Sequence, residues 1–203
     1  MNDQAYIDNI KYQVASGMYD RLFNDRRDLV FLDIGANVGI VSIYAVPYCK
    51  RIVAVEPAPS TFETLVRNTL NYSIIECLQV ALTPRDERHE FFVNDLNFTA
   101  SSTVNTYGEK ITVSGMRFIT ILQHMNLNHV DVCKIDAEGA EGESLDYLQL
   151  EYAKDIIKTY MIEVHNCHKT SWEHKLGTIV GNLARCGYAK QTIEGMAITA
   201  TRP

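Results

Sequence analysis

Residues 29–39 read LVFLDIGANVG, an apolar run that ends at Asp33 and is followed by Gly35 and Gly39. An apolar run without polar alternation is typical of a strand buried on both faces, as in a parallel sheet covered by helices. Glycines between a strand and a helix allow a tight bend and let the backbone approach a ligand closely. This stretch therefore predicts a buried strand, a ligand-binding turn and the start of a helix.

The same pattern recurs along the chain. Residues 52–55, 130–133 and 160–162 are further apolar runs, and residues 38–48 have the apolar content of a helix. Ser60 and Glu63 have the spacing of a capping box, which predicts the start of another helix. Strands and helices that alternate at this spacing predict a doubly wound α/β fold with a mostly parallel, Rossmann-like sheet.

Smaller elements are expected later in the chain. Residues 90–93 and 110–113 read as short strands, and a capping box at 170–173 predicts a helix to about Cys186. Gly187 is well placed to end that helix. Residues 188–193 and 196–201 predict a C-terminal antiparallel hairpin at one edge of the sheet.

The N-terminal 28 residues stand apart from this pattern. Their apolar residues recur at three- and four-residue steps, at Ile7, Ile10, Val14, Met18 and Leu22. This periodicity predicts an amphipathic helix. We therefore expect a helical extension over residues 1–28 and one α/β domain over residues 29–203.

Composition and charge narrow the possible partners. The 203 residues carry a net charge of −6 and contain no run of lysine and arginine, so nucleic acid is not an expected partner. No apolar stretch approaches the roughly 18–20 residues of a membrane span, and the polar N-terminus does not resemble a secretory signal. The five cysteines are widely spaced and odd in number, which favours reduced thiols. These features predict a cytoplasmic protein.

An acidic residue completes the ligand-binding pattern. Glu56 ends the second apolar run, seventeen residues after Gly39. A carboxylate at that position can accept hydrogen bonds from both hydroxyls of an unphosphorylated ribose, which indicates an adenosine-type cofactor. A dinucleotide fingerprint would need glycine where Asn37 stands, and no phosphate-binding Gly-Lys-Ser/Thr sequence is present. An ordinary turn followed by a solvated glutamate remains the alternative.

The D-x-G-x-N-x-G form of residues 33–39 resembles the first motif of class I methyltransferases, which bind S-adenosylmethionine. With Val55–Pro57, Val80–Leu82, Ser101-Ser102, KIDAEGAE at 134–141 and Glu163–His165, the order resembles the signatures of the FkbM methyltransferase family. The resemblance spans about residues 30–165. One departure is Leu122-Gln123, where the family often has Leu-Asp, so any role of that Asp is in doubt here.

The resemblance implies a class I methyltransferase domain over residues 29–203 that transfers the methyl group of S-adenosylmethionine. The acceptor would be a small molecule, usually a hydroxyl of a sugar or secondary metabolite. The residues expected at the cofactor are Asp33, Gly35, Ala36, Asn37, Gly39, Glu56, Pro57 and Ala81.

Methylation of an alcohol profits from a general base, because an alcohol is a poor nucleophile at neutral pH. Asp136 and His165 end two neighbouring strands and are the first candidates, with Glu138 third. Each also has a structural reading: Asp136 as a helix N-cap, His165 as a core histidine, and Glu138 as a favourable charge in a first helical turn. Lys134 either orients Asp136 or is simply a paired lysine.

No metal site is predicted, although oxygen ligands from Asp136, Glu138 and Glu163 would suit a divalent cation. The leading functional hypothesis is an S-adenosylmethionine-dependent O-methyltransferase. Two other classes stay open: a nicotinamide-dependent oxidoreductase with the same ribose-binding Glu56, and a non-catalytic binding module on a methyltransferase scaffold.

Overall fold

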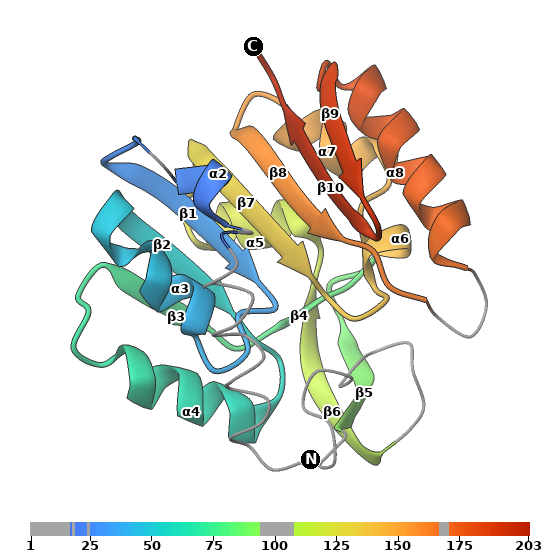
Figure 1. Ribbon diagram of the computed structural model, residues 1–203. Coiled ribbons are helices and arrows are strands. Elements are labelled where there is room, and N and C mark those ends of the chain that lie inside the picture. Colours follow the sequence, from blue (N-terminus) through green and yellow to red (C-terminus); the bar gives the residue numbers. More distant parts are fainter. Residues whose placement is uncertain (1–16, 18, 24, 94–107, 167–170) are drawn as a thin grey trace.

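The main sheet of the computed structural model has seven strands in the order β3-β2-β1-β7-β8-β10-β9 (Figure 1). The structure describes residues 17, 19–23, 25–93, 108–166 and 171–203. The strands are β1 (Leu29–Ile34), β2 (Cys49–Val55), β3 (Ile75–Leu78), β7 (Val130–Asp136), β8 (Ile157–Glu163), β9 (Lys190–Glu194) and β10 (Ala197–Thr201). The first five strands of that order pair in parallel, and β10 pairs antiparallel with both β8 and β9. The predicted parallel sheet and C-terminal hairpin are both confirmed.

Helices cover both faces of this sheet, as a doubly wound fold requires. On one face lie α2 (Asp20–Phe23), α3 (Ile40–Ala45) with the short helix η1 (Val46–Tyr48), and α4 (Pro59–Thr69). On the other face lie α5 (Phe118–His124), α7 (Tyr147–Ala153) and α8 (Trp172–Arg185).

The two faces divide the side chains of each strand between two cores. In β1, Leu32 packs in the cluster with α5, α7 and α8, whereas Phe31 packs with α2 and α3. Successive side chains of a strand point to opposite faces. Both faces of β1 are therefore shielded from solvent, which explains its unbroken apolar run.

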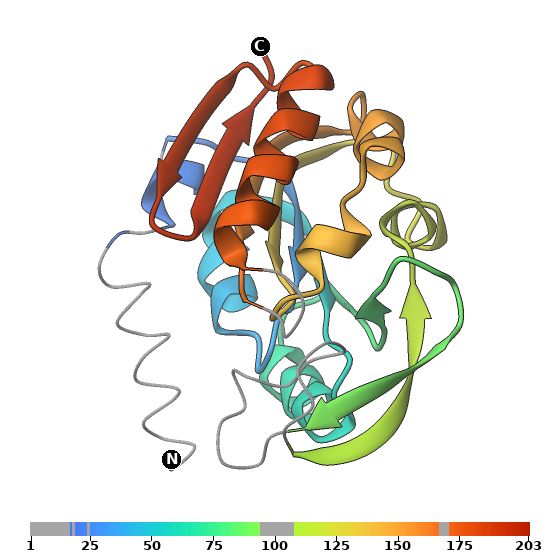
Figure 2. The same ribbon diagram turned by 90° about the vertical axis from the view of Figure 1, so that its right-hand side faces the viewer.

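A second, three-stranded sheet lies beside the carboxyl ends of the main strands (Figures 1 and 2). It contains β4 (Ala81–Leu82), β5 (Arg88–Val93) and β6 (Glu109–Met116), with β5 and β6 antiparallel. The two short strands expected at 90–93 and 110–113 are confirmed and are longer than predicted. Ser101 and Ser102 of the family pattern lie outside the described residues.

The helix ends test the capping predictions. The capping box at Ser60 is wrong: α4 begins one residue earlier at Pro59, and its N-cap Ala58 makes no side-chain hydrogen bond. Proline suits the first helical position, because its missing N–H has no partner there in any case. The N-cap of α8 is Ser171, whose hydroxyl accepts from the backbone of His174, and Thr170 lies outside the described residues.

Two further expectations concern the chain ends. Gly187 adopts φ +89° directly after α8 and its C-cap, as expected for a residue that ends a helix. Of the predicted N-terminal periodicity, Leu22 is buried in α2, whereas Ile7, Ile10, Val14 and Met18 lie outside the described residues. Among the helices of the described ranges, none combines the length and apolar character needed to cross a membrane.

Candidate active site

The carboxyl ends of four neighbouring strands meet at one edge of the main sheet. Ile34 of β1 lies opposite Val55 of β2 and Ile135 of β7, and Asp136 lies opposite Glu163 of β8. The chain reverses its direction of progress across the sheet between β1 and β7. Ligands of open α/β sheets bind in the crevice outside such a switch point. The predicted cofactor and catalytic residues are thus brought to the same edge.

Gly35 begins the turn after β1. Its N–H and that of Ala36 both donate to the carbonyl of Val55 at 2.9 Å. Gly35 has φ +76°, and a Cβ placed on it would lie 1.8 Å from the carbonyl oxygen of Asp136. The glycine is therefore required by the approach of β7.

Glu56 follows β2 and turns its carboxylate back toward the same loop. Its Oε2 accepts from the N–H of Asn37 at 3.1 Å, and its Oε1 accepts from the N–H of Ala58 at 3.0 Å. Burial raises the pKa of Glu56 to about 7, although both backbone N–H groups act to lower it. Each oxygen keeps a further lone pair, so the carboxylate can still accept hydrogen bonds from two hydroxyls. Glu56 is therefore a buried carboxylate that can accept two further hydrogen bonds, which the two ribose hydroxyls of an adenosine cofactor could donate.

Asp33 lies behind the turn. It is fully buried, accepts from the Ser42 hydroxyl at 2.7 Å and pairs with Lys134 at 3.2 Å. Lys134 also donates to the carbonyl of Gly35 at 3.0 Å and lies 3.5 Å from Asp136. Burial alone would lower the pKa of Lys134, but Asp33 and Asp136 raise it well above its usual value. This charged lysine therefore ties the cofactor turn to the end of β7.

The other predicted cofactor residues surround this turn. Gly39 adopts φ +89° immediately before α3, and a Cβ there would meet Leu65 at 2.7 Å. Pro57 lies between Glu56 and the buried Ala58. Ala81 of β4 is buried in the cluster that joins Ala58, the N-cap of α4, to the small sheet. Gly39, Pro57 and Ala81 thus lie in the segments that follow β1, β2 and β3.

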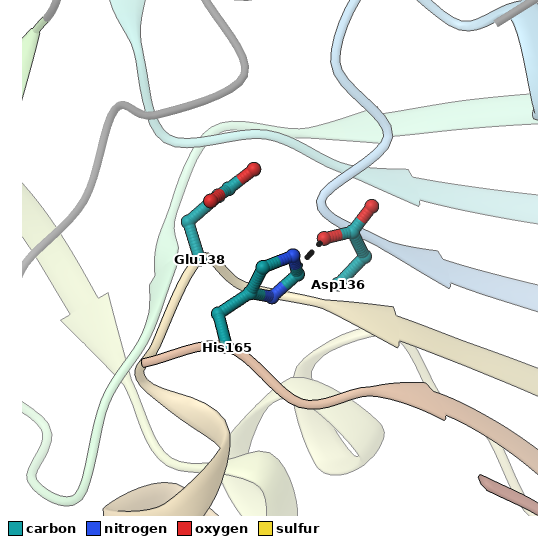
Figure 3. A group of neighbouring side chains, drawn as sticks. All are labelled: Asp136, Glu138 and His165. Atoms are coloured by element: carbon teal, nitrogen blue, oxygen red, sulfur yellow. Dashed lines mark ion pairs between the residues drawn. The ribbon is translucent and has the colours of Figure 1, made fainter. Parts of the chain in front are cut away.

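Asp136, Glu138 and His165 point toward one another (Figure 3). Each offers one ligand atom, and these atoms lie within 4.8 Å of one another. Asp136 is the last residue of β7, and His165 stands two residues after β8. Glu138 adopts φ +50° in the turn that follows β7. The structure thus groups the three candidate catalytic residues.

Glu141 holds that turn in place. It is fully buried, begins the helix α6 (Glu141–Ser144), and accepts from the N–H groups of Ala137 at 2.9 Å and Gly139 at 3.2 Å. The N-cap of α6 is Ala140, which excludes the reading of Asp136 as the cap of this helix. Glu141 itself lies in the first turn of α6.

His165 is surrounded by carboxylates. Its Nδ1 lies 3.3 Å from Glu141 and 3.8 Å from Asp136, and its Nε2 lies 3.5 Å from Glu163. A neutral imidazole has only one N–H, so two ring nitrogens that face carboxylates indicate an imidazolium. Burial acts to lower the pKa of His165, but the hydrogen bonds to Glu141 and Glu163 raise it to about 11. His165 is therefore a cation at neutral pH.

Burial raises the pKa of both carboxylates at the open side. Burial raises the pKa of Glu138 to about 8, so this group is largely protonated at pH 7. Burial also raises the pKa of Asp136, but Lys134 and His165 act in the opposite direction. Within the described part of the chain, Oδ1 of Asp136 is buried and receives no hydrogen bond. This oxygen forms the 3.8 Å ion pair with Nδ1 of His165 that Figure 3 marks.

The same group has the composition of a metal site. It differs from the set considered in the sequence, because His165 takes the place of Glu163. A metal ligand must be a neutral imidazole with a free nitrogen lone pair, whereas both nitrogens of His165 face carboxylates. In this arrangement the imidazolium itself neutralises the carboxylates.

Lys175 is a residue of the site that the sequence did not reveal. It is 4% exposed, and its Nζ donates to the carbonyls of Gly139 at 2.7 Å and His165 at 2.9 Å. It joins the loops after β7 and β8 from the amphipathic helix α8. No local signal separates such a lysine from the solvated lysines of other helices, because its partners are backbone carbonyls far away in the chain.

The fold and this site define a class I methyltransferase. Residues 33–190 match the model of the methyltransferase FkbM domain, so the chain belongs to that family, and S-adenosylmethionine is its cofactor. A search of curated protein sequences finds no match.

Solved structures agree with the fold. Precorrin-6y C5,15-methyltransferase from Geobacter metallireducens is 15% identical, with a TM-score of 0.52 and coverage of 92% of this chain and 86% of that one. A precorrin 8w decarboxylase of Methanobacterium thermoautotrophicum is 12% identical, with a TM-score of 0.53 and coverage of 92% and 88%. Aeropyrum pernix fibrillarin, solved with natively bound S-adenosylmethionine, is 12% identical, with a TM-score of 0.50 and coverage of 87% and 67%.

Proposed function

We propose that this methyltransferase methylates a hydroxyl group of a sugar or another small metabolite, with Asp136 as the general base. The observation that carries the proposal is the buried Oδ1 of Asp136, which receives no hydrogen bond from a described residue at the edge where the cofactor binds. A hydroxyl group placed there would supply the missing donor. S-adenosylmethionine supplies a methyl group that its positive sulfur has already activated.

The neighbouring charges favour Asp136 over the other two candidates. His165 is an imidazolium and has no lone pair with which to accept a proton. Glu138 is mostly protonated at pH 7, since its pKa is raised to about 8. Burial raises the pKa of Asp136 as well, but Asp136 stands between Lys134 at 3.5 Å and His165 at 3.8 Å, and both cations act against that rise.

The proposed roles follow from these contacts. Asp136 would accept the proton as the hydroxyl oxygen forms its bond to the methyl carbon, while the bond from that carbon to the sulfonium sulfur breaks and the electron pair stays on sulfur, leaving S-adenosylhomocysteine. Lys134 and His165 hold the carboxylate in place on either side. Lys175 and Glu141 fix the two loops from which Glu138 and His165 project, so that the acceptor is aligned and water is excluded.

We further propose a small-molecule partner and a cytoplasmic site of action. The net charge of −6 supports an acceptor other than nucleic acid. Cys49, Cys77, Cys133 and Cys186 are free thiols, which suits a reducing compartment. The match to a methyltransferase family favours this activity over the oxidoreductase alternative.

The test uses cofactor labelled with ¹³C at the methyl group and a panel of sugars, phenols and amines. We expect label transfer to a sugar or other alcohol, and a methyl carbon resonance in the region of an O-methyl ether. Label found on nitrogen or carbon would contradict O-methylation. Cofactor binding without turnover of any acceptor in cell extract would favour the non-catalytic alternative.

A further inference from the structure

A second pocket lies on the sheet face that carries α2, away from the catalytic edge. Its volume is about 430 Å³, and it is lined in part by Lys158 and Thr159 at the start of β8. Thr159 and Glu163 share one face of β8 and stand four residues apart. At about 3.3 Å per residue this places the pocket roughly 13 Å from the carboxyl end of the strand. It is therefore separate from the cofactor and catalytic residues.

The lining is strongly cationic. Its basic residues are Arg21, Arg26, Lys158 and Lys190, and the lining formed by described residues includes no acidic side chain. Arg21 pairs with Glu194 at 2.7 Å and Arg26 pairs with Asp131 at 3.4 Å. Lys158 and Lys190 form no ion pair with a described residue. Although the chain has a net charge of −6, this pocket therefore contains two lysines whose positive charges are not neutralised by an ion pair with a described residue.

Hydroxyl groups complete the lining. They belong to Thr159, Thr192, Thr199 and Thr201, which come from three adjacent strands. Thr201 lies opposite both Thr159 and Lys190, and its hydroxyl donates to that of Thr159 at 3.4 Å. The hydroxyl of Thr199 is buried and has no hydrogen-bond partner within the described residues. A buried polar atom without a partner indicates a missing ligand or solvent group.

Most of this pocket is built by segments outside the family model, which covers residues 33–190. Arg21 and Arg26 precede that range, and Thr192, Thr199 and Thr201 follow it. Ile198 and Ala200 of β10 pack into the core with α8, so the alternating Thr199 and Thr201 face the opposite side of the sheet. Figure 1 shows α2 beside β8 and the hairpin of β9 and β10 beyond it.

We propose that this pocket binds a phosphorylated small molecule of sugar-phosphate size. Lys158 and Lys190 hold the phosphate group, because ammonium groups form charge-assisted hydrogen bonds with its oxygens. The hydroxyl of Thr199 donates to the same ligand. The pocket volume falls in the range of small-molecule sites and exceeds what a lone phosphate ion fills.

Calorimetry with inorganic phosphate, ribose 5-phosphate, glucose 6-phosphate and unphosphorylated ribose tests the proposal at constant ionic strength. We expect a sugar phosphate to bind and ribose not to bind, also when S-adenosylhomocysteine saturates the cofactor site. Lys158→Gln and Lys190→Gln together should weaken binding at least about tenfold. Lys50→Gln is the matched control, because Lys50 is an exposed strand lysine outside the pocket. Its binding should equal that of the unaltered protein.

Thr199→Val tests the geometry independently of charge. Valine has nearly the same shape and removes the buried hydroxyl that has no partner. We expect weaker binding of the sugar phosphate with no decrease in melting temperature. Three outcomes would overturn the proposal: no phosphorylated probe binds, Lys50→Gln weakens binding as much as the pocket variants, or S-adenosylhomocysteine displaces the probe.

Discussion

Glu56 and Asp136 are two carboxylates at the same sheet edge, yet the protein holds them in different ways. Glu56 is held by backbone N–H groups of Asn37 and Ala58, which are near it in the chain or belong to the adjoining turn. Asp136 stands between two cationic side chains, Lys134 and His165. The first arrangement suits a neutral, hydroxyl-bearing ligand. The second sets two cations against the burial that raises the pKa of Asp136.

Position along the sheet explains the difference. Glu56 faces the turn after β1, where Gly35 and Asn37 adopt left-handed conformations and the Asn37 N–H points at the Glu56 carboxylate. The loops after β7 and β8 instead bring side chains together, and Glu141 and Lys175 satisfy their backbone groups. After the roles proposed for them, we call the part around Glu56, held by backbone donors, the cofactor half, and the part around Asp136, held by paired side chains, the acceptor half.

The largest expected effect lies in the acceptor half. Asp136→Asn should lower turnover by about 10²–10⁴-fold, because the amide keeps the shape but cannot accept the proton. Affinity for S-adenosylhomocysteine should stay unchanged, and Asp33 remains as a partner of the buried Lys134. Turnover measured with labelled cofactor and calorimetry separate the two effects.

Two variants serve as controls for this prediction. Glu138→Gln and His165→Gln remove the other candidates for the base and should each cost less turnover than Asp136→Asn. If His165→Gln is inactive while Asp136→Asn keeps near-normal turnover, the histidine is the base and the assignment of an imidazolium is wrong.

A smaller effect is expected in the cofactor half. Glu56→Ala should weaken binding of S-adenosylhomocysteine at least about tenfold, since charge-assisted bonds to the two ribose hydroxyls contribute roughly 1.5–3 kcal/mol. It also leaves the N–H groups of Asn37 and Ala58 without their acceptor, so a loss of melting temperature accompanies it. Glu56→Gln retains one acceptor oxygen and should lose affinity with a smaller loss of stability. Unchanged affinity in both variants would remove Glu56 from the ribose site.

The smallest effect is a pH dependence of cofactor binding. The pKa of Glu56 is raised to about 7, so protonation between pH 8 and pH 6 removes part of its acceptor capacity. We expect S-adenosylhomocysteine to bind severalfold more weakly at pH 6 than at pH 8, and Glu56→Gln to abolish most of this slope. If the pH dependence of S-adenosylhomocysteine binding persists in Glu56→Gln, another titratable group causes it.

The raised pKa of Glu56 also makes the free energy of unfolding depend on pH, and this dependence runs in the opposite direction to that of cofactor binding. The pKa of Glu56 is higher in the folded chain than the 4.5 of an exposed glutamate. The folded state therefore binds the proton more tightly, and the contribution of Glu56 to the free energy of unfolding falls as the pH rises from about 4.5 to 7. The melting temperature of Glu56→Gln should depend less on pH in this window.

Much of the fold was predictable from local pattern. The apolar runs at 29–32 and 52–55 proved to be buried parallel strands, because a strand covered on both faces cannot contain exposed polar alternation. The turn of Gly35 and the strand-end Glu56 were equally visible, since both follow directly from where a strand ends. The capping box at Ser60 misled, because Pro59 starts the helix by its fixed φ without any side-chain cap.

The sequence by itself thus determined the sheet, the family and the cofactor edge, all of which depend on short-range periodicity and motif order. Only the tertiary structure decided that Gly35 makes room for Asp136, that His165 is a cation and that Lys175 joins two loops. Each of these depends on partners that the fold brings together from distant parts of the chain. Charge state and close approach are properties of such neighbourhoods, and no local pattern of residues encodes them.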